Sequence, residues 1–599
     1  MAPINNEAGN SVEVEHQMAP TAIDPPEKIN TSLIQNPYLL GVACFASLGG
    51  LLFGYDQGVV SGILTMESFG AAFPKIFVNP GFKGWFVSTI LLTAWFGSLV
   101  NGPLADKLGR KKNMILAVII FVAGSAVQAG AVNIEMLFAS WPCRRWIRRR
   151  NVDDGDPSLY FRGIPTRDSW RACRIATTWV NSGVYIHSTY LQYVVSITIG
   201  ILVSYWIDYG THYIGGSRCA PDIPYSGGIL TSPSFDPYND LGSSGCTGQS
   251  DASWRIPFAL QILPAIILGI GMMFYPDSPR WLMMQEKDEQ AIKVLSKLRR
   301  LSPDHPKLVA EVLEIRASIL LENAFVKDHY AGLAGFKLHV AQYMSLVNNK
   351  ARFWRLSVGC CIMFFQQFIG CNAMIYYAPT IFAQLGLSGN TTSLLATGVY
   401  GIVNTLATVP AVLFIDRVGR KPLLMSGAAG TCISLVIVGA IIAAYGDTLP
   451  QHKAAGWVGI AFIYIYDINF SYSFGPIGWV LPSEIFTLAI RSKAISITTS
   501  TTWMCNFIIG LVTPDMLATI GWGTYIFFAA FALLAFGFTY FFVPETRGKT
   551  LEDMDLAFGD TAAHEEKTRI MHIEAQLRGV QVDGSNPEKL TTAWSHNEV

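Results

Sequence analysis

Charged residues are scarce in this chain. Only 14% of its 599 residues are Asp, Glu, Lys or Arg, whereas hydrophobic residues make up 51%. A soluble domain carries about 25% charged residues. The mean hydropathy is +0.34. This composition excludes an ordinary soluble protein and predicts a chain that crosses a lipid bilayer many times.

The sequence also lacks the marks of several other classes. The net charge is zero, which gives no indication of nucleic acid as a partner. The ten cysteines include no C-x-x-C pair, so no metal or redox site is expected. No hydrolytic constellation is present, so we expect neither an enzyme nor a cofactor. Residues 1–36 contain no apolar run of a signal peptide, and we expect 1–36 and 557–599 to be disordered cytoplasmic tails.

Long apolar runs, by contrast, are frequent. A spanning helix needs roughly 20 mostly apolar residues. Eleven candidate runs lie near 38–62, 85–104, 114–133, 190–209, 256–275, 357–384, 393–415, 422–445, 457–481, 494–513 and 523–543. Lys and Arg concentrate in cytoplasmic loops. The basic stretches after the second run, within 280–355 and after the last run therefore predict that these loops and both termini are cytoplasmic.

A charged phrase occurs twice, each time between two apolar runs. Residues 106–112 read DKLGRKK and residues 416–422 read DRVGRKP. A phrase that recurs at one place in two hydrophobic halves indicates an internal repeat. Transporters are commonly built in this way, with the substrate site between the halves.

The first half, however, has one crossing too few. The run at 114–133 ends outside, and the run at 190–209 must begin inside, because 256–275 has to return before the basic linker. A crossing is therefore needed between 134 and 190. Residues 141–160 contain eight charged side chains, which would cost roughly 20–28 kcal/mol in a bilayer at about 2.5–3.5 kcal/mol each. This segment will not insert as a lone helix.

Further motifs occur in a fixed order. They are GGLLFGYD at 49–56, PDSPRWL at 276–282, QQFIGCN at 366–372 followed by two tyrosines, GPIGW at 475–479 and PETRGKT at 544–550. Over about 37–139 and 195–556 the chain resembles the sugar porters of the major facilitator superfamily, particularly fungal hexose transporters. The resemblance implies an all-α membrane protein with two pseudo-symmetric six-helix halves, at 37–275 and 356–556, joined by a cytoplasmic helical linker at 276–355.

The family pattern for helix 4 is missing, and an aberrant segment at 140–194 stands in its place. That pattern begins Gly-Arg-x-x-x-Gly-x-Gly and ends in Arg-Gly. Tryptophan has one codon, so a one-base shift forces glycine after Trp141, Trp146 and Trp170. These are three places where the pattern has glycine. We therefore hypothesise that 140–179 is a frame slip and that 180–194 is extra, as from an unspliced intron; the alternative is a divergent loop.

Amide side chains predict a sugar site. Amides both donate and accept hydrogen bonds, and aromatic faces cover the apolar side of a sugar ring. Gln366, Gln367 and Asn372 lie in one apolar run at spacings that keep them on roughly one helical side. The resemblance makes these the main sugar ligands and adds further contacts at Tyr376, Asn404, Trp479, Trp503 and Asn506. The alternatives are interhelical hydrogen bonding for an isolated amide and interface packing for Trp503.

Two further features follow from the resemblance. A family glutamine at the start of helix 5 aligns near Val194, and in this chain it is either absent or displaced into the alternative frame. Asp56 is a carboxylate inside the first apolar run, where such groups are costly and usually functional. The resemblance makes Asp56 the proton acceptor of a symporter, although its arginine partner exists only in the alternative frame. Related facilitators also carry an acid here, so symport and facilitated diffusion both stay open.

The repeated phrases lie at predicted cytoplasmic helix ends. Their charges can pair with acids and bases of neighbouring helices and so hold one side of the carrier closed until substrate shifts the balance. The predicted gate consists of Asp106, Gly109, Arg110, Asp277, Arg280, Asp416, Gly419, Arg420, Glu484, Arg491, Glu545 and Arg547. The alternative is simple positive-inside anchoring, which leaves the matching Asp and Gly unexplained.

The predicted outer loops carry two candidate modifications. The loop at 210–255 is rich in Gly, Pro and Ser, and its Cys219 and Cys246 can form a disulfide in an oxidising compartment. Asn390 opens an N-glycosylation sequon.

Together these features predict a monomeric, multi-pass plasma-membrane protein that takes up a monosaccharide, a hexose such as glucose, with a proton and by alternating access. The alternatives are a facilitative carrier, a sugar sensor that does not transport, and a non-functional product of a misread gene. Sensors tend to have longer cytoplasmic tails than this one, which favours transport.

Overall fold

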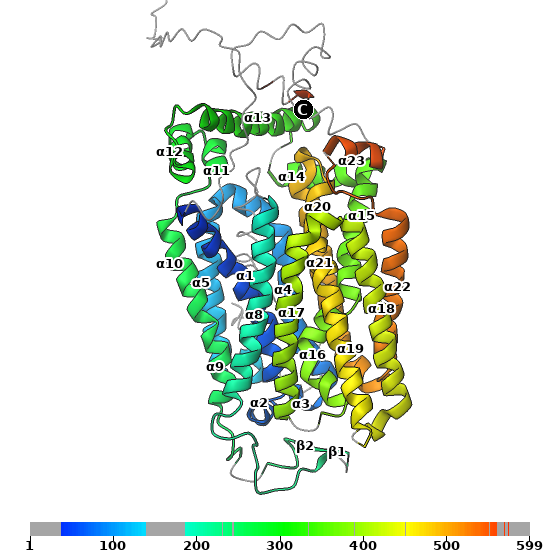
Figure 1. Ribbon diagram of the computed structural model, residues 1–599. Coiled ribbons are helices and arrows are strands. Elements are labelled where there is room, and N and C mark those ends of the chain that lie inside the picture. Colours follow the sequence, from blue (N-terminus) through cyan, green and yellow to red (C-terminus); the bar gives the residue numbers. More distant parts are fainter. Residues whose placement is uncertain are drawn as a thin grey trace, which may run out of the picture.

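A computed structural model describes residues 37–138, 186–229, 232–241, 245–333, 335–387, 390–449, 451–549 and 551–559, with 568, 569 and 573. The predicted tails, apart from 557–559 and those three residues, and the segment 140–179 lie outside the described residues. The described chain is a bundle of long helices capped by shorter ones at one end (Figure 1).

The first half contributes α1 (Pro37–Ile63), α4 (Pro80–Leu108), α5 (Arg110–Ala129), α8 (Ile186–Thr211), α9 (Ala252–Leu260) and α10 (Ile262–Phe274). Shorter helices lie between them, namely α2 (Glu67–Ala72), α3 (Pro74–Val78) and α6 (Ile134–Phe138). The second half contributes α15 (Lys350–Phe368), α16 (Cys371–Gln384), α17 (Asn390–Val418), α18 (Arg420–Tyr445), α19 (Lys453–Tyr472), α20 (Phe474–Ile485), α21 (Leu488–Thr519) and α22 (Gly523–Phe542).

Eight described helical stretches are long and apolar enough to cross a membrane. The other three predicted runs, at 38–62, 85–104 and 457–481, coincide with α1, α4 and the pair α19–α20. The chain is therefore an all-α, multi-pass membrane protein.

The two ends of the bundle differ (Figure 1). One end, here the linker end, carries α11 (Pro279–Met284), α12 (Asp288–Arg299), α13 (Pro306–His329), α14 (Gly335–Asn348) and α23 (Leu551–Phe558). The opposite end, here the loop end, carries α2, α3 and an antiparallel pair of strands, β1 (Gly227–Ile229) and β2 (Ser232–Ser234). A short 3₁₀ turn, η4 (Gly446–Thr448), follows α18.

Three predicted runs are broken into two helices each. The run at 357–384 divides between α15 and α16 at Gly370, whose φ is +97°. A Cβ at Gly370 would lie 2.8 Å from the Phe528 ring. A positive φ is open to glycine and ends the helix, so the prediction of one continuous helical face for Gln366, Gln367 and Asn372 is wrong. Ser473, with φ −115° and ψ −93°, separates α19 from α20, and Gln261 separates α9 from α10.

The packing of α8 on α1 fixes the direction of the chain. A Cβ at Gly54 would lie 1.9 Å from the Ile197 carbonyl oxygen, and one at Gly62 would lie 2.4 Å from Asp208. The residue numbers at these contacts increase in the same direction along both helices, so α1 and α8 run parallel. Helix α8 therefore begins at the linker end, as α1 does.

The end of α6 lies at the opposite end of the bundle. The Phe138 ring contacts Phe86, which contacts Phe69 of α2 at the loop end. Residues 138 and 186 therefore lie at opposite ends of the bundle, and the count of crossings from the sequence requires one crossing between these two positions. Residues 186–194, which the frame hypothesis treats as extra, form the first turns of α8.

Candidate functional site

A central cavity of about 690 Å³ lies between the two halves. Helices of both halves line it, with Phe53 and Gln57 from α1 and Val194 from α8. Of the eight predicted sugar-binding residues, seven line it, namely Gln366, Gln367, Asn372, Asn404, Trp479, Trp503 and Asn506.

The amides of α15 and α16 form a connected chain. Gln366 Nε2 donates to the backbone oxygens of Phe474 at 2.9 Å and Gly475 at 3.2 Å. Gln367 Nε2 donates to Gln366 Oε1 at 3.4 Å, and Asn372 Nδ2 donates to Gln367 Oε1 at 2.5 Å. The break after α15 thus turns Asn372 back toward Gln367, and Gln366 both lines the cavity and ties α15 to the break between α19 and α20.

Tyr376 lies beside the cavity and joins three helices. Its hydroxyl accepts hydrogen bonds from Asn506 Nδ2 at 3.2 Å and from Gln57 Nε2 at 3.5 Å. Sequence reasoning missed Gln57, although it lies in the first apolar run next to Asp56. Trp503 lines the cavity and also packs edge-on against Phe53, with ring centroids 5.5 Å apart. Trp503 therefore packs between helices as well as lining the cavity, and its contact with sugar stays a prediction.

Two buried carboxylates also escaped the sequence reasoning. Asp208 in α8 and Asp467 in α19 are each 0% exposed. Asn404 Nδ2 donates to Asp467 Oδ1 at 2.8 Å, so Asp467 lies directly behind a cavity residue. The rule that singled out Asp56, a carboxylate inside an apolar run, would have found both.

Asp56 faces a different space. It lines a second cavity of about 450 Å³ among α1, α4, α5 and α9, together with Ser125, Gln128 and Gln261. Gln261 Nε2 donates to Gln128 Oε1 at 3.4 Å. Among the described residues that line this second cavity, none is cationic. Asp56 thus stands one residue from the central cavity but opens to the other side of α1.

At the linker end, the second repeated phrase forms a connected polar cluster. The Arg420 guanidinium is almost fully buried and donates to Asp416 at 2.9 Å and Glu484 at 2.7 Å. Glu545 accepts from the backbone N–H of Arg420 at 2.9 Å and of Lys421 at 3.0 Å. Four chain segments therefore meet at one arginine and one glutamate.

Two further members of the predicted gate, Arg491 and Arg547, lie at the same end of the second half. Thr546 Oγ1 donates to Glu484 at 2.6 Å, and the Arg547 N–H donates to Glu545 at 2.9 Å. Arg491 Nε donates to the Phe486 carbonyl at 3.2 Å, so this arginine ties the start of α21 to the end of α20.

The glycines of both repeated phrases have positive φ and a close neighbour. Gly109 has φ +80°, and its Cβ would lie 2.9 Å from the Trp281 ring. Gly419 has φ +102°, and its Cβ would lie 2.7 Å from Glu545 Oε2. Trp281 belongs to α11, which begins at Pro279; Arg280 is its second residue, and Asp277 lies just before it. The side chains of Asp106 and Arg110 lie outside the described residues.

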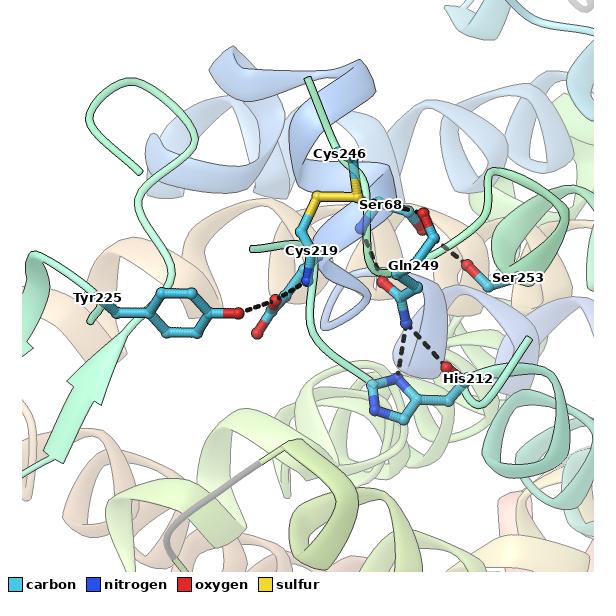
Figure 2. The surroundings of a disulfide bond; sticks show 8 residues. Ser68, His212, Cys219, Tyr225, Cys246, Gln249 and Ser253 are labelled. Carbon is cyan, nitrogen blue, oxygen red and sulfur yellow. Dashed lines mark hydrogen bonds between the residues drawn. A yellow bond between two sulfur atoms is a disulfide. The ribbon is translucent and has the colours of Figure 1, made fainter. Parts of the chain in front are cut away.

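At the loop end, a disulfide joins Cys219 to Cys246 (Figure 2). The Glu67 carboxylate accepts hydrogen bonds from the Cys219 N–H at 2.6 Å and from the Tyr225 hydroxyl. Burial raises the pKa of Glu67, and these hydrogen bonds oppose the rise. Burial and the bond to Glu67 raise the pKa of Tyr225 to about 12.

The same region is fixed from a second side. Gln249 Oε1 accepts from the Ser68 N–H at 2.8 Å, and its Nε2 donates to the His212 carbonyl at 2.9 Å (Figure 2). Burial lowers the pKa of His212, which keeps its ring neutral and able to accept from Gln249. The loop at 210–255 is thus held to α2 and to the end of α8. Asn390 opens α17 beside this end, but its side chain lies outside the described residues.

Comparisons with known proteins agree with this architecture. The model of the family described as "Sugar (and other) transporter" matches residues 42–148 and 189–558, and so skips 149–188. A probable quinate permease of Aspergillus niger is 30% identical over 87% of each chain. A glucose transporter, mfs1, of Aspergillus flavus is 29% identical over 91% of this chain and 94% of its own.

Among solved structures, the proton:xylose symporter XylE bound to 6-bromo-6-deoxy-D-glucose is 26% identical, with a TM-score of 0.61 over 87% of this chain and 99% of its own. XylE from E. coli in a partially occluded inward-open state gives a TM-score of 0.59 at 25% identity, over 86% of this chain and 100% of its own. The family match, the bundle of spanning helices and the cavity between two halves lead to one conclusion: the chain belongs to the sugar transporter family of the major facilitator superfamily.

Proposed function

We propose that this protein carries a neutral monosaccharide, a hexose such as glucose, across the plasma membrane by alternating access. The observation that carries this proposal is the chemistry of the central cavity. Six carboxamide side chains and two tryptophans line it, and no lining side chain among the described residues is charged. Amides suit the dense hydroxyls of a sugar, and indole faces suit the apolar side of its ring.

Quinate is the second candidate, because the relatives that are 30% identical are named as quinate permeases. Quinate is a carboxylate. Moving an unpaired carboxylate from water into an uncharged site is costly unless a cation meets it. The uncharged lining of the central cavity therefore favours a neutral sugar over this anion.

Uptake measurements separate the two candidates. The chain is expressed in cells that lack hexose carriers of their own, both as encoded and with the frame of 140–179 shifted by one base. We expect saturable uptake of labelled glucose that quinate does not inhibit. Saturable quinate uptake that glucose does not inhibit would overturn the hexose proposal.

We propose in addition that a proton accompanies the sugar and that Asp56 binds it. Asp56 lies in the membrane-spanning α1, directly before Gln57 of the central cavity. Sugar uptake should alkalinise the medium and collapse with a protonophore. Asp56→Asn should abolish accumulation against a gradient and leave sugar exchange intact. Accumulation by the variant, or uptake without proton movement, would show facilitated diffusion or another proton site.

The linker end supplies a fitting gate. We propose that it faces the cytoplasm and that the cluster of Arg420, Asp416, Glu484 and Glu545 holds this end of the second half together until sugar binds. The buried ion pair of Arg420 and Glu484 supports this, because such a pair breaks only when both groups reach water. Cysteine labelling at Arg547 from each side of the membrane tests the orientation.

A further inference from the structure

Asp467 is a carboxylate in the interior of the second half. It lies in α19 and is 0% exposed. Its Oδ1 accepts a hydrogen bond of 2.8 Å from Asn404 Nδ2, which reaches across from α17. The side chains of Tyr400 and Ser471 also lie beside this carboxylate. Its other titratable neighbours are Tyr205 of α8, Cys371 of α16 and Tyr466 of α19. No neighbour among them carries a positive charge.

This contact decides how the Asn404 amide is turned. In the structure the NH₂ group of Asn404, and not its oxygen, faces the carboxylate, which is the arrangement that an accepting carboxylate oxygen requires. Asn404 Nδ2 donates its second hydrogen to Ser471 Oγ at 3.1 Å. Both amide hydrogens of Asn404 are therefore taken up by protein acceptors. An asparagine without such a neighbour can present either end of its amide.

This arrangement leaves the side-chain oxygen of Asn404 without a hydrogen-bond donor. Asn404 lines the central cavity, and its Oδ1 is buried without a hydrogen-bond partner among the described residues. Buried acceptors are nearly always satisfied in folded proteins. A hydroxyl group that enters the cavity can supply the missing hydrogen.

We propose that Asp467 is a positioning residue for the transported substrate. It holds Asn404 with Oδ1 toward the cavity, so that this part of the site accepts a hydrogen bond and requires a ligand hydroxyl that donates one. The proposal rests on the proposed sugar-binding role of the central cavity. It specifies the direction of one hydrogen bond there, in which the protein accepts and the sugar donates. Asp467 itself does not line the cavity.

Sugar analogues test this polarity. Inhibition of glucose uptake is measured with each monodeoxy and each monofluoro glucose. A fluorine accepts but cannot donate, so at the hydroxyl that meets Asn404 both analogues should bind weakly, by roughly three- to tenfold for one hydrogen bond. Asp467→Asn frees the amide to turn, and the fluoro analogue at that position should regain affinity while the deoxy analogue does not.

Two controls keep the experiment decisive. Asp208→Asn removes another fully buried carboxylate, which lies against Gly62 of α1 and does not line the central cavity, and should leave the pattern of analogue affinities unchanged. If Asp467→Asn does not reach the membrane, Ser471→Ala, which removes the second acceptor of Asn404 Nδ2, takes its place and should weaken the discrimination in the same direction.

The outcomes separate this inference from the proposed function. Wild-type protein that takes up no monosaccharide contradicts the proposed function. Wild-type protein that transports glucose, with an Asp467→Asn variant that keeps the wild-type fluoro and deoxy pattern, contradicts the positioning role alone. If the fluoro analogue regains affinity in Asp467→Asn but not in Asp208→Asn, the result supports both the proposed function and the positioning role of Asp467.

Discussion

Two glycines show how single residues shape the linker end. Gly109 and Gly419 hold equivalent places in the repeated phrases, and both have positive φ. Each lies against a bulky neighbour, Trp281 or Glu545. The repeat that identified two halves in the sequence is therefore also a repeated steric requirement, which simple anchoring by positive charge does not explain.

Replacing Gly419 by alanine should loosen the linker end. Gly419 has φ +102° and ψ +161°, a backbone conformation that is essentially restricted to glycine and costs other residues roughly 1–3 kcal/mol. A Cβ here would also meet Glu545 Oε2 at 2.7 Å. We expect Gly419→Ala to lower the midpoint of thermal unfolding in detergent and to slow sugar uptake. Gly537→Ala is the matched control, because Gly537 lies inside α22 and a Cβ there would meet no described atom within 4 Å. Equal midpoints for the two variants would refute this steric role.

Residue types predicted much of the candidate site, but not its pairings. Gln366, Gln367, Asn372, Asn404 and Asn506 stand out because amides are unusual in apolar runs. Which amide meets which partner depends on packing between helices. The hydrogen bond from Asn404 to Asp467 joins positions 63 apart in the chain, on α17 and α19. No local sequence pattern predicts such a pairing.

At the scale of elements, hydropathy located the spans and missed their breaks. A window of about 20 residues averages over local geometry, and the run at 357–384 stays apolar through Gly370. The chain contains 54 glycines, many of them within helices, so a single glycine does not mark a break. This break nevertheless allows the Asn372 side chain to donate a hydrogen bond to Gln367.

The loop end depends on a covalent link between elements. The disulfide of Cys219 and Cys246 closes a loop over a sequence separation of 27, for which loop-closure entropy predicts roughly 3–4 kcal/mol of stabilisation. A Cys219→Ser/Cys246→Ser double variant should therefore unfold at a lower temperature than the wild-type chain, as measured without reductant. Reductant should lower the wild-type midpoint to that of the variant.

A free cysteine provides the control for this experiment. Cys432 is partly buried in α18 and is not bonded to another cysteine. Cys432→Ser should change the unfolding midpoint little, with or without reductant. A wild-type midpoint that reductant does not move would contradict a stabilising role for the disulfide.

For the whole molecule, the number of crossings is the central question. The parallel packing of α1 and α8 and the position of Phe138 at the loop end place the two described ends of this gap at opposite ends of the bundle. The family model stops at 148 and resumes at 189. The second cavity, which contains Asp56, opens among α1, α4, α5 and α9, within the half that has the gap. Sequence and structure thus agree on where a crossing is required.

A gene corrected over this gap should transport sugar better than the chain as encoded. The corrected version reads 140–179 in the frame that yields the three forced glycines and omits 180–194. Its segment replaces eight charges within 141–160, which would oppose insertion by roughly 20–28 kcal/mol, with a helix able to cross and an arginine to meet Asp56. We expect glucose uptake at least tenfold above that of the encoded chain at equal surface expression. Sequencing of the transcript supplies the independent check, because intact messages that encode Arg144 to Arg150, or equal uptake by both versions, would show that the segment belongs to the working carrier.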